Sequence, residues 1–416
     1  MRTFSIFSTL FVATLATTAA AQIVYVDRDA TGAGDGTSWT NAYPSLRTAL
    51  DLAAPGDELW VAEGVYTPGP TAAIADTFQL KSGVALYGGF AGTEIARSER
   101  DWAAHPTVLS GDVGQDDVYG PYAWYIGWNI VTANSAQVVT GSGTDASAVL
   151  DGFTVEAGGT GPSGTPAGSW EMYAGGMMLI NGSPTVTHCT FRRNIAAFGH
   201  GGAIYAQDSS PTLTHCKFVE NYVHLGDGAG IYLAGASAPV IADCEFVANQ
   251  CVGGTGGGQG FGSGISRWAT PPMTVERCKF DLNEARGFYA SGADLCRGGG
   301  IANFYDGLVV RDCTFTRNRA HAGSGIYTFG TLDVVNTVFA NNVALSYALG
   351  SSSGGGFGAA VCSSSAQADV TTITNCVVYG NQGGDDVGVY TFWSHQTLVR
   401  NSILWGNVAT GEQVPP

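Results

Sequence analysis

Apolar and polar positions in the second half of the chain follow one pattern that repeats about every 24 to 28 residues, with longer copies where segments are inserted. Each unit opens with glycines before an Ile-centred strand, as at residues 201–205 (Gly-Gly-Ala-Ile-Tyr), and closes with Phe-x-x-Asn, as at residues 218–221. Apolar and polar residues alternate within these short segments, and no ten-residue helical pattern separates them. The repeat predicts an all-β solenoid in which each unit is one coil of a parallel β-helix.

Equivalent residues of successive coils are expected to lie above one another at the strand spacing of ~4.8 Å. The Ile and Phe positions then fill the interior, and the asparagine amides can hydrogen-bond from coil to coil. An asparagine also tolerates the left-handed backbone of a tight turn. The predicted structural ladder consists of Asn194, Asn221, Asn249, Asn283, Asn318, Asn342, Asn381 and Asn407.

The two ends of the solenoid differ. Residues 44–53 carry apolar residues at helical spacing between Pro44 and Pro55-Gly56, which predicts a short N-terminal capping helix over the open strand edges of the first coil. Residues 22–148 are assigned to this cap and the irregular first coils, residues 149–407 to the regular coils, and residues 408–416 to a short tail. We expect the last coil to be bare, either because the chain is truncated or because something else caps it.

The first 21 residues predict export. An apolar run over residues 4–18 is followed by Ala19-Ala20-Ala21 before Gln22, which is typical of a signal peptide cleaved near Ala21. No later segment has the roughly 18 uninterrupted apolar residues of a membrane span. We therefore expect a secreted, periplasmic or cell-surface protein without a membrane span.

Composition and charge narrow the class of partner. The 60 glycines, 45% hydrophobic residues and only 12% charged residues indicate many turns around a large apolar interior and argue against disorder. A net charge of −16 argues against nucleic acid and anionic membranes as partners. It also disfavours a polyanionic sugar unless cations or local arginines intervene.

Nine cysteines fall into two groups. Six of them, with Thr337 and Ser402, stand two residues before the Phe position, and stacked side chains of this kind are expected to be buried thiols. Cys251, Cys296 and Cys362 lie off this column and are the better disulfide candidates in an exported protein. No Cys and His spacing matches a zinc site.

With these motifs, the chain resembles right-handed parallel β-helix proteins of the pectate-lyase-like superfamily, in particular those with polymorphic-outer-membrane-protein repeats. The Gly-Gly-Ala-Ile of residues 201–204 and the Phe-x-x-Asn of residues 218–221 carry the resemblance, which extends over residues 23–407. It implies a right-handed solenoid. The superfamily includes polysaccharide lyases, glycoside hydrolases, phage tailspikes and non-catalytic surface proteins, so the resemblance leaves the function open.

Two groups of residues are candidates for catalysis. Gly199-His200-Gly201 is similar to an element of polygalacturonases, but its glycines belong to the repeat and the companion Asn-Thr-Asp and Arg-x-Lys motifs are missing. A lyase needs a base and a cation that stabilises the enolate. Solvated loop charges explain the candidate residues at least as well, so no catalytic residue is assigned. These candidates are Arg267, Arg286, Arg297 and Arg319, with Asp294 and His321 as partners.

Neither acidic segment of the chain matches a known calcium motif. Residues 27–35 and residues 112–117 offer carboxylates, but they have neither an EF-hand nor a nonapeptide spacing. We expect turn-forming loops there and no cofactor, with Ca²⁺ unsupported by any specific motif.

An aromatic face is the more informative feature. Alternation along the Ile-centred strands places aromatic residues on the outside, in steps of one coil. Such rings can stack on sugars, or they can stack on each other beneath the inserted loops. The favoured interpretation is a non-catalytic, adhesin-like protein that binds a polysaccharide or cell-surface glycan, and the alternative is a β-eliminating enzyme acting on a uronic-acid polymer. The expected ligand-binding residues are Tyr205, Tyr232, Trp268, Phe304, Tyr327, Phe329, Arg267 and Arg297.

Overall fold

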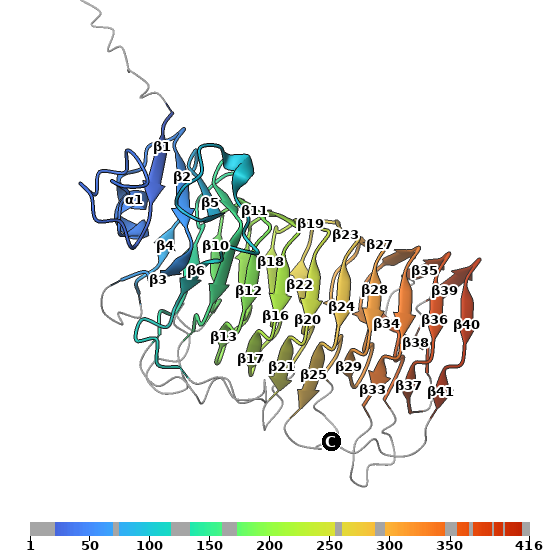
Figure 1. The fold of residues 1–416 in the computed structure, drawn as a ribbon. Coiled ribbons are helices and arrows are strands. Elements are labelled where there is room, and N and C mark those ends of the chain that lie inside the picture. The colour runs from blue at the N-terminus through green and yellow to red at the C-terminus, as the bar shows by residue number, and fades with distance from the viewer. Residues whose placement is uncertain are drawn as a thin grey trace, which may run out of the picture.

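Four parallel sheets wind around one axis as a right-handed β-helix (Figure 1). The computed structural model describes residues 21–69, 75–117, 134–159, 173–253, 260–287, 296–345, 356–365, 369–384, 387–393 and 396–409. In each regular coil the chain passes from sheet C to sheet A, then to sheet B and sheet D, before it enters the next coil. The predicted all-β solenoid is confirmed.

Within the described residues, sheets A and B have twelve and eleven strands. Sheet A consists of β1 (Ile23–Val26), β2 (Glu58–Ala62), β5 (Ala85–Phe90), β8 (Val149–Asp151), β11 (Thr185–Thr187), β15 (Thr212–Thr214), β19 (Val240–Ala242), β23 (Met273–Glu276), β27 (Leu308–Arg311), β31 (Leu332–Val335), β35 (Val370–Thr374) and β39 (Gln396–Arg400). Sheet B consists of β3 (Gly64–Tyr66), β6 (Thr107–Ser110), β9 (Phe153–Glu156), β12 (Thr190–Arg192), β16 (Lys217–Val219), β20 (Glu245–Val247), β24 (Lys279–Asp281), β28 (Thr314–Thr316), β32 (Val338–Ala340), β36 (Val377–Tyr379) and β40 (Ile403–Trp405).

Sheets C and D have ten and eight strands in the same part of the chain. Sheet C consists of β4 (Phe78–Gln79), β7 (Val139–Thr140), β10 (Met177–Ile180), β14 (Ile204–Gln207), β18 (Ile231–Gly235), β22 (Ile265–Ala269), β26 (Ile301–Asn303), β30 (Ile326–Thr328), β34 (Val361–Ser365) and β38 (Val389–Trp393). Sheet D consists of β13 (Ile195–Ala196), β17 (Tyr222–His224), β21 (Gln250–Gly253), β25 (Glu284–Gly287), β29 (Arg319–Ala320), β33 (Val343–Ala344), β37 (Gln382–Gly383) and β41 (Val408–Ala409).

In the sheet B strands from β12 to β36, the central residue points into the solenoid. Phe191 pairs in register with Phe218, and Phe218 with Phe246, so the rings lie directly above one another. Successive rings from Phe191 to Phe339 stack with centroids 4.5–5.4 Å apart. The period of the sequence therefore places the aromatic core, because stacked coils bring equivalent residues together.

The asparagines form a continuous hydrogen-bonded file. Asn249 illustrates its pattern, since its Oδ1 accepts from the backbone N–H of Asn221 at 3.2 Å and from Asn221 Nδ2 at 3.0 Å. Its own Nδ2 donates to the carbonyl oxygen of Phe218 at 2.8 Å and to Asn283 Oδ1 at 2.9 Å. The same bonds run from Asn194 to Asn407, and the file is fully buried except at Asn407.

The left-handed backbone lies one residue before each asparagine, and not at the asparagine as expected. Arg193, Glu220 and Ala248 have φ angles of 55°, 53° and 54°, whereas their asparagine neighbours do not have a positive φ. Each asparagine is therefore needed for the hydrogen bonds of its amide in the ladder. The residue before it adopts the left-handed conformation that makes the turn.

All nine cysteines are free and buried. The Sγ atoms of the six column cysteines lie 3.1–3.3 Å from the carbonyl oxygen two residues earlier. The disulfide expectation for Cys251, Cys296 and Cys362 is wrong, because each packs in a different small apolar cluster under the loops. Burial raises the pKa of the Cys189 thiol to about 12, so this group is also unreactive in the folded chain.

The predicted cap is present as helix α1 (Leu46–Leu52), and η1 (Arg97–Glu99) is a short 3-10 turn. Ser45 caps α1 by accepting a hydrogen bond from the Thr48 backbone N–H at 3.2 Å. Leu46 and Leu50 of α1 are buried in the same core as the strands, so the helix closes the N-terminal end of the solenoid (Figure 1).

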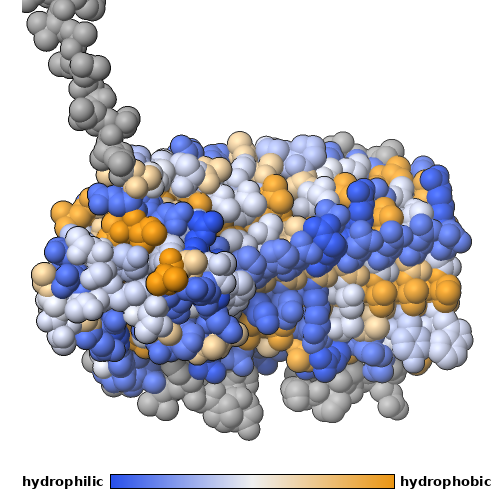
Figure 2. Space-filling model, turned by 45° about the horizontal axis from the view of Figure 1, so that its top comes forward, coloured by the Kyte–Doolittle hydropathy of each residue, from blue (hydrophilic) through white to orange (hydrophobic). Residues whose placement is uncertain are grey.

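At the other end, the last described coil exposes large apolar side chains. Ile403, Leu404 and Trp405 of β40 are 63%, 46% and 67% exposed. Figure 2 shows orange surface gathered at this end of the cylinder, with hydrophilic residues in a band along its length. Among the described residues, no helix is both long enough and apolar enough to span a membrane.

Candidate functional site

The inserted segments lie between the strands of sheet D and the following strands of sheet C. The segments that lengthen the repeat are residues 250–261, 284–297, 343–354 and 382–386, and parts of each fall outside the described residues. Where the chain is described, single parallel bridges join Phe261 to Arg297, Arg297 to Ala322, and Ala322 to Phe357. The loop bases are therefore stacked from coil to coil beside sheet C.

A groove of about 460 Å³ opens where these loop bases meet sheet C. It brings together four aromatic residues and one arginine that were predicted from the sequence, and two further residues. Its lining consists of Trp268, Arg297, Phe304, Tyr305, Tyr327, Phe329 and Ser364. Four of the six aromatic residues of the expected face thus lie in one groove.

Two stacked rings form the floor of the groove. Trp268 and Phe304 lie nearly parallel, with centroids 4.0 Å apart and an angle of 13° between their planes. Both are partly exposed, and Tyr305 and Phe329 beside them are 41% and 40% exposed. Tyr327 is 3% exposed, because it packs in a cluster with Phe357 and Tyr390.

Arg297 is the cation of the groove. Its guanidinium carbon lies 4.9 Å from the ring centroid of Tyr327 and 5.6 Å from that of Phe261. Aromatic faces attract a cation without neutralising it, so the N–H groups of the guanidinium retain their capacity to donate. No described carboxylate lies within ion-pair distance of Arg297, and none lines the groove.

Arg267 is not part of this surface, which corrects the expectation for it. It is fully buried inside the solenoid, and Nη1 donates to Asn303 Oδ1 at 2.5 Å and to the Tyr305 carbonyl at 2.8 Å. Nη2 donates to the carbonyl oxygens of Pro271 and Asp306. Side chains alternate along a strand, so Arg267 must point inward if Trp268 points outward. The strand pattern alone therefore predicts that Arg267 is buried.

The remaining predicted tyrosines belong to a separate cluster nearer the N-terminus. Tyr205 and Tyr232 stack with centroids 5.4 Å apart, and Tyr173 packs against Tyr205 at 5.0 Å. Tyr205 is only 5% exposed, so the expectation of an exposed ring there is wrong. The outward side of sheet C thus carries two aromatic groups in place of one continuous stripe.

His200 and Asp227 adjoin this second cluster. The backbone N–H of Asp227 donates to His200 Nδ1 at 3.1 Å, which fixes that nitrogen as an acceptor, and the His200 ring stacks on Tyr232 at 4.3 Å. Burial lowers the pKa of His200 to about 4 and raises the pKa of Asp227 to about 7. Asp227 is 6% exposed, whereas His200 is partly exposed, and neither residue lines the groove.

The other lyase candidates do not converge on the groove. Arg319 lies 3.8 Å from Glu284, and His321 is 8% exposed. Arg286 is partly exposed on sheet D, and Asp294 lies outside the described residues. The described lining of the groove combines one cation with aromatic rings and holds no carboxylate or imidazole, although the Asp227 carboxyl group lies next to Trp268 and accepts from the Phe261 backbone N–H at 2.9 Å.

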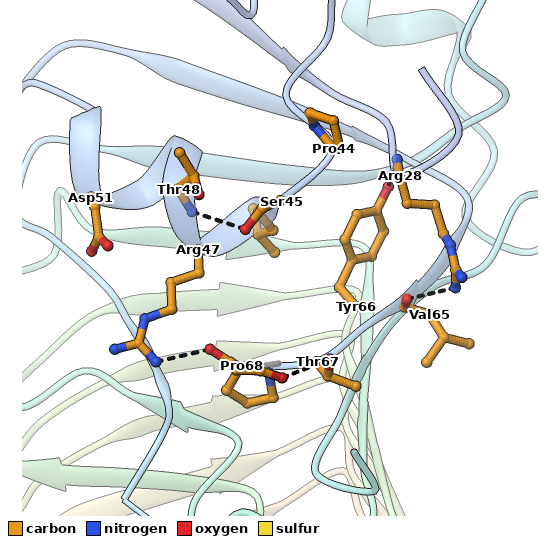
Figure 3. Close-up of a pocket in the computed structure, with 12 residues that line it drawn as sticks. Arg28, Pro44, Ser45, Arg47, Thr48, Asp51, Val65, Tyr66, Thr67 and Pro68 are labelled. Atoms are coloured by element: carbon orange, nitrogen blue, oxygen red, sulfur yellow. Dashed lines mark hydrogen bonds between the residues drawn. The ribbon is translucent and has the colours of Figure 1, made fainter. Parts of the chain in front are cut away.

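A second hollow, of about 660 Å³, lies beside α1 and β3 at the N-terminal end (Figure 3). Its arginines are engaged by the protein itself. Arg47 Nη1 donates to Asp76 Oδ1 at 2.6 Å and to the Pro68 carbonyl at 2.9 Å, while Arg28 donates to the Val65 carbonyl at 2.8 Å. These bonds hold the cap on the first coils.

Residues 169–295 match a family model described as "Right handed beta helix region". No curated protein sequence matches the chain.

Three solved β-helix enzymes share low similarity with the chain. They are the pectate lyase Pel9A (15% identity, 96% of this chain and 82% of that chain, TM-score 0.43), a rhamnogalacturonan lyase (10%, 92% and 87%, TM-score 0.43) and the family 28 exopolygalacturonase of Yersinia enterocolitica (13%, 93% and 79%, TM-score 0.36). Similarity at this level carries no argument about the chemistry of this chain.

The groove contains residues that sequence reasoning missed. Tyr305 and Ser364 line it, and Phe261 supports Arg297 from the neighbouring loop. Tyr305 follows Phe304 directly, so its outward position had no signal in the alternation, which ends where β26 ends at Asn303. Ser364 lies two strands further along sheet C, and only the stacking of coils brings it to the groove.

Proposed function

We propose that this protein binds glycans without cleaving them, through the groove lined by Trp268, Phe304 and Arg297. The observation that carries the proposal is the nearly parallel, partly exposed stack of Trp268 and Phe304 beside an arginine that has no described carboxylate partner. Exposed aromatic surface next to a few convergent polar groups is the usual composition of a ligand site.

The chemistry suits a sugar for two reasons. The apolar face of a pyranose can lie against the aromatic floor, while the hydroxyls at its edge face the guanidinium N–H donors and Ser364 in the lining. Tyr305 and Phe329 extend the apolar surface beyond the floor, so more than one sugar unit of a chain can be in contact. In the second aromatic cluster, Tyr205 is too buried to contribute.

A β-eliminating enzyme is the weaker candidate. It requires a base close to the cation that stabilises the enolate. The described lining of the groove supplies Arg297 alone, and neither Asp227, which lies next to Trp268, nor His200 lines it. The arrangement therefore favours binding over β-elimination.

The test is a glycan-array screen of the secreted chain, followed by titration of the best ligand against variants. Trp268→Ala is expected to weaken binding about tenfold or more, because it removes one ring of the floor. Trp405→Ala is the matched control, since Trp405 is also an exposed tryptophan stacked on a neighbouring ring, at 5.4 Å from Tyr379, but it lies on sheet B.

Two results would overturn the proposal. One is equal loss of binding in Trp268→Ala and Trp405→Ala, which would place the ligand elsewhere. The other is release of unsaturated uronates, detected by ultraviolet absorbance, when the wild-type chain is incubated with uronic-acid polysaccharides. That outcome would establish the lyase in place of the binding protein.

A further inference from the structure

Asp227 belongs to a column of residues at the entrance to sheet C. Each member precedes a glycine whose backbone N–H donates to the carbonyl oxygen of the next member, so the residues stack from coil to coil. Asp227 therefore stands one coil before Phe261 and two coils before Arg297, the cation of the groove. The column consists of His200, Asp227, Phe261, Arg297, Ala322 and Phe357.

The carboxyl group of Asp227 reaches the supports of both the cation and the floor of the groove. It accepts a hydrogen bond from the Phe261 backbone N–H at 2.9 Å, and the Phe261 ring lies 5.6 Å from the Arg297 guanidinium carbon. It also lies next to Trp268, one of the two rings of the floor. The Trp268 Nε1 atom is buried and has no hydrogen-bond partner among the described residues. A buried indole N–H without an acceptor is costly, and the carboxyl group is the acceptor that lies beside it.

No fixed charge compensates this carboxyl group. In the described part of the chain, the basic side chain within ion-pair distance is His200, whose Nδ1 lies 3.6 Å from Asp227 Oδ2. Burial lowers the pKa of His200 to about 4, so this ring is neutral near pH 7. The Tyr232 hydroxyl on β18 and the Cys251 thiol on β21 also face Asp227, and burial raises the pKa of each well above its usual value. Burial raises the pKa of Asp227 to about 7, so this group changes its charge near neutral pH while its neighbours do not.

We propose that Asp227 is a pH-dependent positioning residue of the groove, and that its ionised form holds the Trp268 indole and the Phe261 backbone in place. A charged acceptor forms a stronger hydrogen bond with an N–H donor than a neutral carboxyl group does. Ionisation therefore draws the indole N–H onto the carboxylate and fixes the plane of the ring. Protonation weakens this hold and lets the ring turn.

Two consequences follow for the molecule. The orientation of Trp268 changes with pH even when no ligand is bound. The affinity of the groove for a glycan rises as the pH increases through about 7, because the floor is then fixed before the ligand arrives. The second consequence rests on the proposed function, whereas the first does not.

The coupling between Asp227 and Trp268 is measured without a ligand, by fluorine-19 NMR of the full secreted chain labelled with 5-fluorotryptophan. The resonance that disappears in Trp268→Phe identifies this residue among the nine tryptophans. In the wild-type chain its chemical shift should move with a midpoint near pH 7, and in Asp227→Asn it should not move there. Asp208→Asn is the matched control and should keep the step, because Asp208 also accepts a backbone N–H of the next coil, from Ala236 at 2.8 Å, but is exposed and outside the groove.

The coupling is overturned if the Trp268 resonance of the wild-type chain shows no step near pH 7, or if the step persists in Asp227→Asn. Glycan titrations near pH 5.5 and pH 8.5 then measure the effect on binding. We expect the wild-type affinity to be about threefold or more higher at the upper pH, and the affinity of Asp227→Asn to be the same at both. A wild-type affinity that does not change with pH would refute control of the groove by Asp227. Failure of the proposed function gives a different result, in which no glycan binds at either pH while the Trp268 step and its loss in Asp227→Asn still establish the coupling.

Discussion

Substitution of Asn249 by alanine is the most direct test of how the coils are held together. The change removes four side-chain hydrogen bonds, two accepted from Asn221 and two donated to Phe218 and Asn283. Each such bond contributes about 0.5–1.5 kcal/mol net. Because the site is fully buried, water cannot replace them, and we expect a loss of about 4 kcal/mol in the free energy of unfolding.

Asn407→Ala provides the comparison within the same ladder. The Asn407 side chain makes three bonds, to the backbone and side-chain nitrogens of Asn381 and to the Val378 carbonyl. It is partly exposed, so solvent can satisfy the groups that the substitution leaves behind. We expect a cost of about 1 kcal/mol or less.

The assay is urea unfolding followed by far-ultraviolet circular dichroism, with the three proteins compared under identical conditions. Local loss of coils at the C-terminal end would appear as an early, small transition in Asn407→Ala, whereas Asn249→Ala should move the main transition. Equal effects of the two substitutions, or a shift below about 1 kcal/mol for Asn249→Ala, would refute the view that the buried amides supply coil-to-coil stability.

Three further predictions concern the buried polar and sulfur groups. Arg267→Met should lower stability by about 3–5 kcal/mol in thermal unfolding, because it removes a donor from four oxygens, of which the Tyr305 carbonyl keeps another from Asn303 Nδ2, and a neutral effect would contradict the assigned role. The pKa of Asp227, about 7, lies above its ordinary value of 3.8, so the folded state holds this proton more tightly and stability is lost as the pH rises from about 4 through 7. Asp227→Asn should therefore gain about 2–3 kcal/mol relative to wild type between pH 5 and pH 8, and unfolding curves that keep the same separation at both pH values would disprove the shift. All nine thiols should react with a thiol reagent only in denaturant, and rapid labelling of the native chain would show that the cysteines are accessible.

The repeat predicted the architecture because equivalent residues recur in every unit and therefore come to lie above one another when the coils stack. Once Phe218 and Asn221 are matched to Phe246 and Asn249, stacking alone places the rings and amides in their columns. The helical spacing of residues 44–53 likewise predicted α1, whose capping serine follows the proline.

The site was predictable only in part, since exposure depends on which segments cover each strand. Tyr205 and Tyr327 occupy outward positions, yet Tyr173 and Phe357 pack over them from the loops. The charge of Arg267 suggested a place on the ligand-binding surface, but its position in the strand alternation turns the side chain inward.

The hydrogen bonds between successive asparagines of the file all run in the same direction. Each Oδ1 receives two bonds from the coil before it, so a coil that has just closed presents an unused backbone N–H and amide group to the one that follows. Every turn is thereby a template for its successor, starting from the end that α1 seals. Assembly by sequential addition, with growth away from the sealed end, is a natural consequence, and whole turns can be gained or lost in evolution without a change in the rule by which the next one attaches.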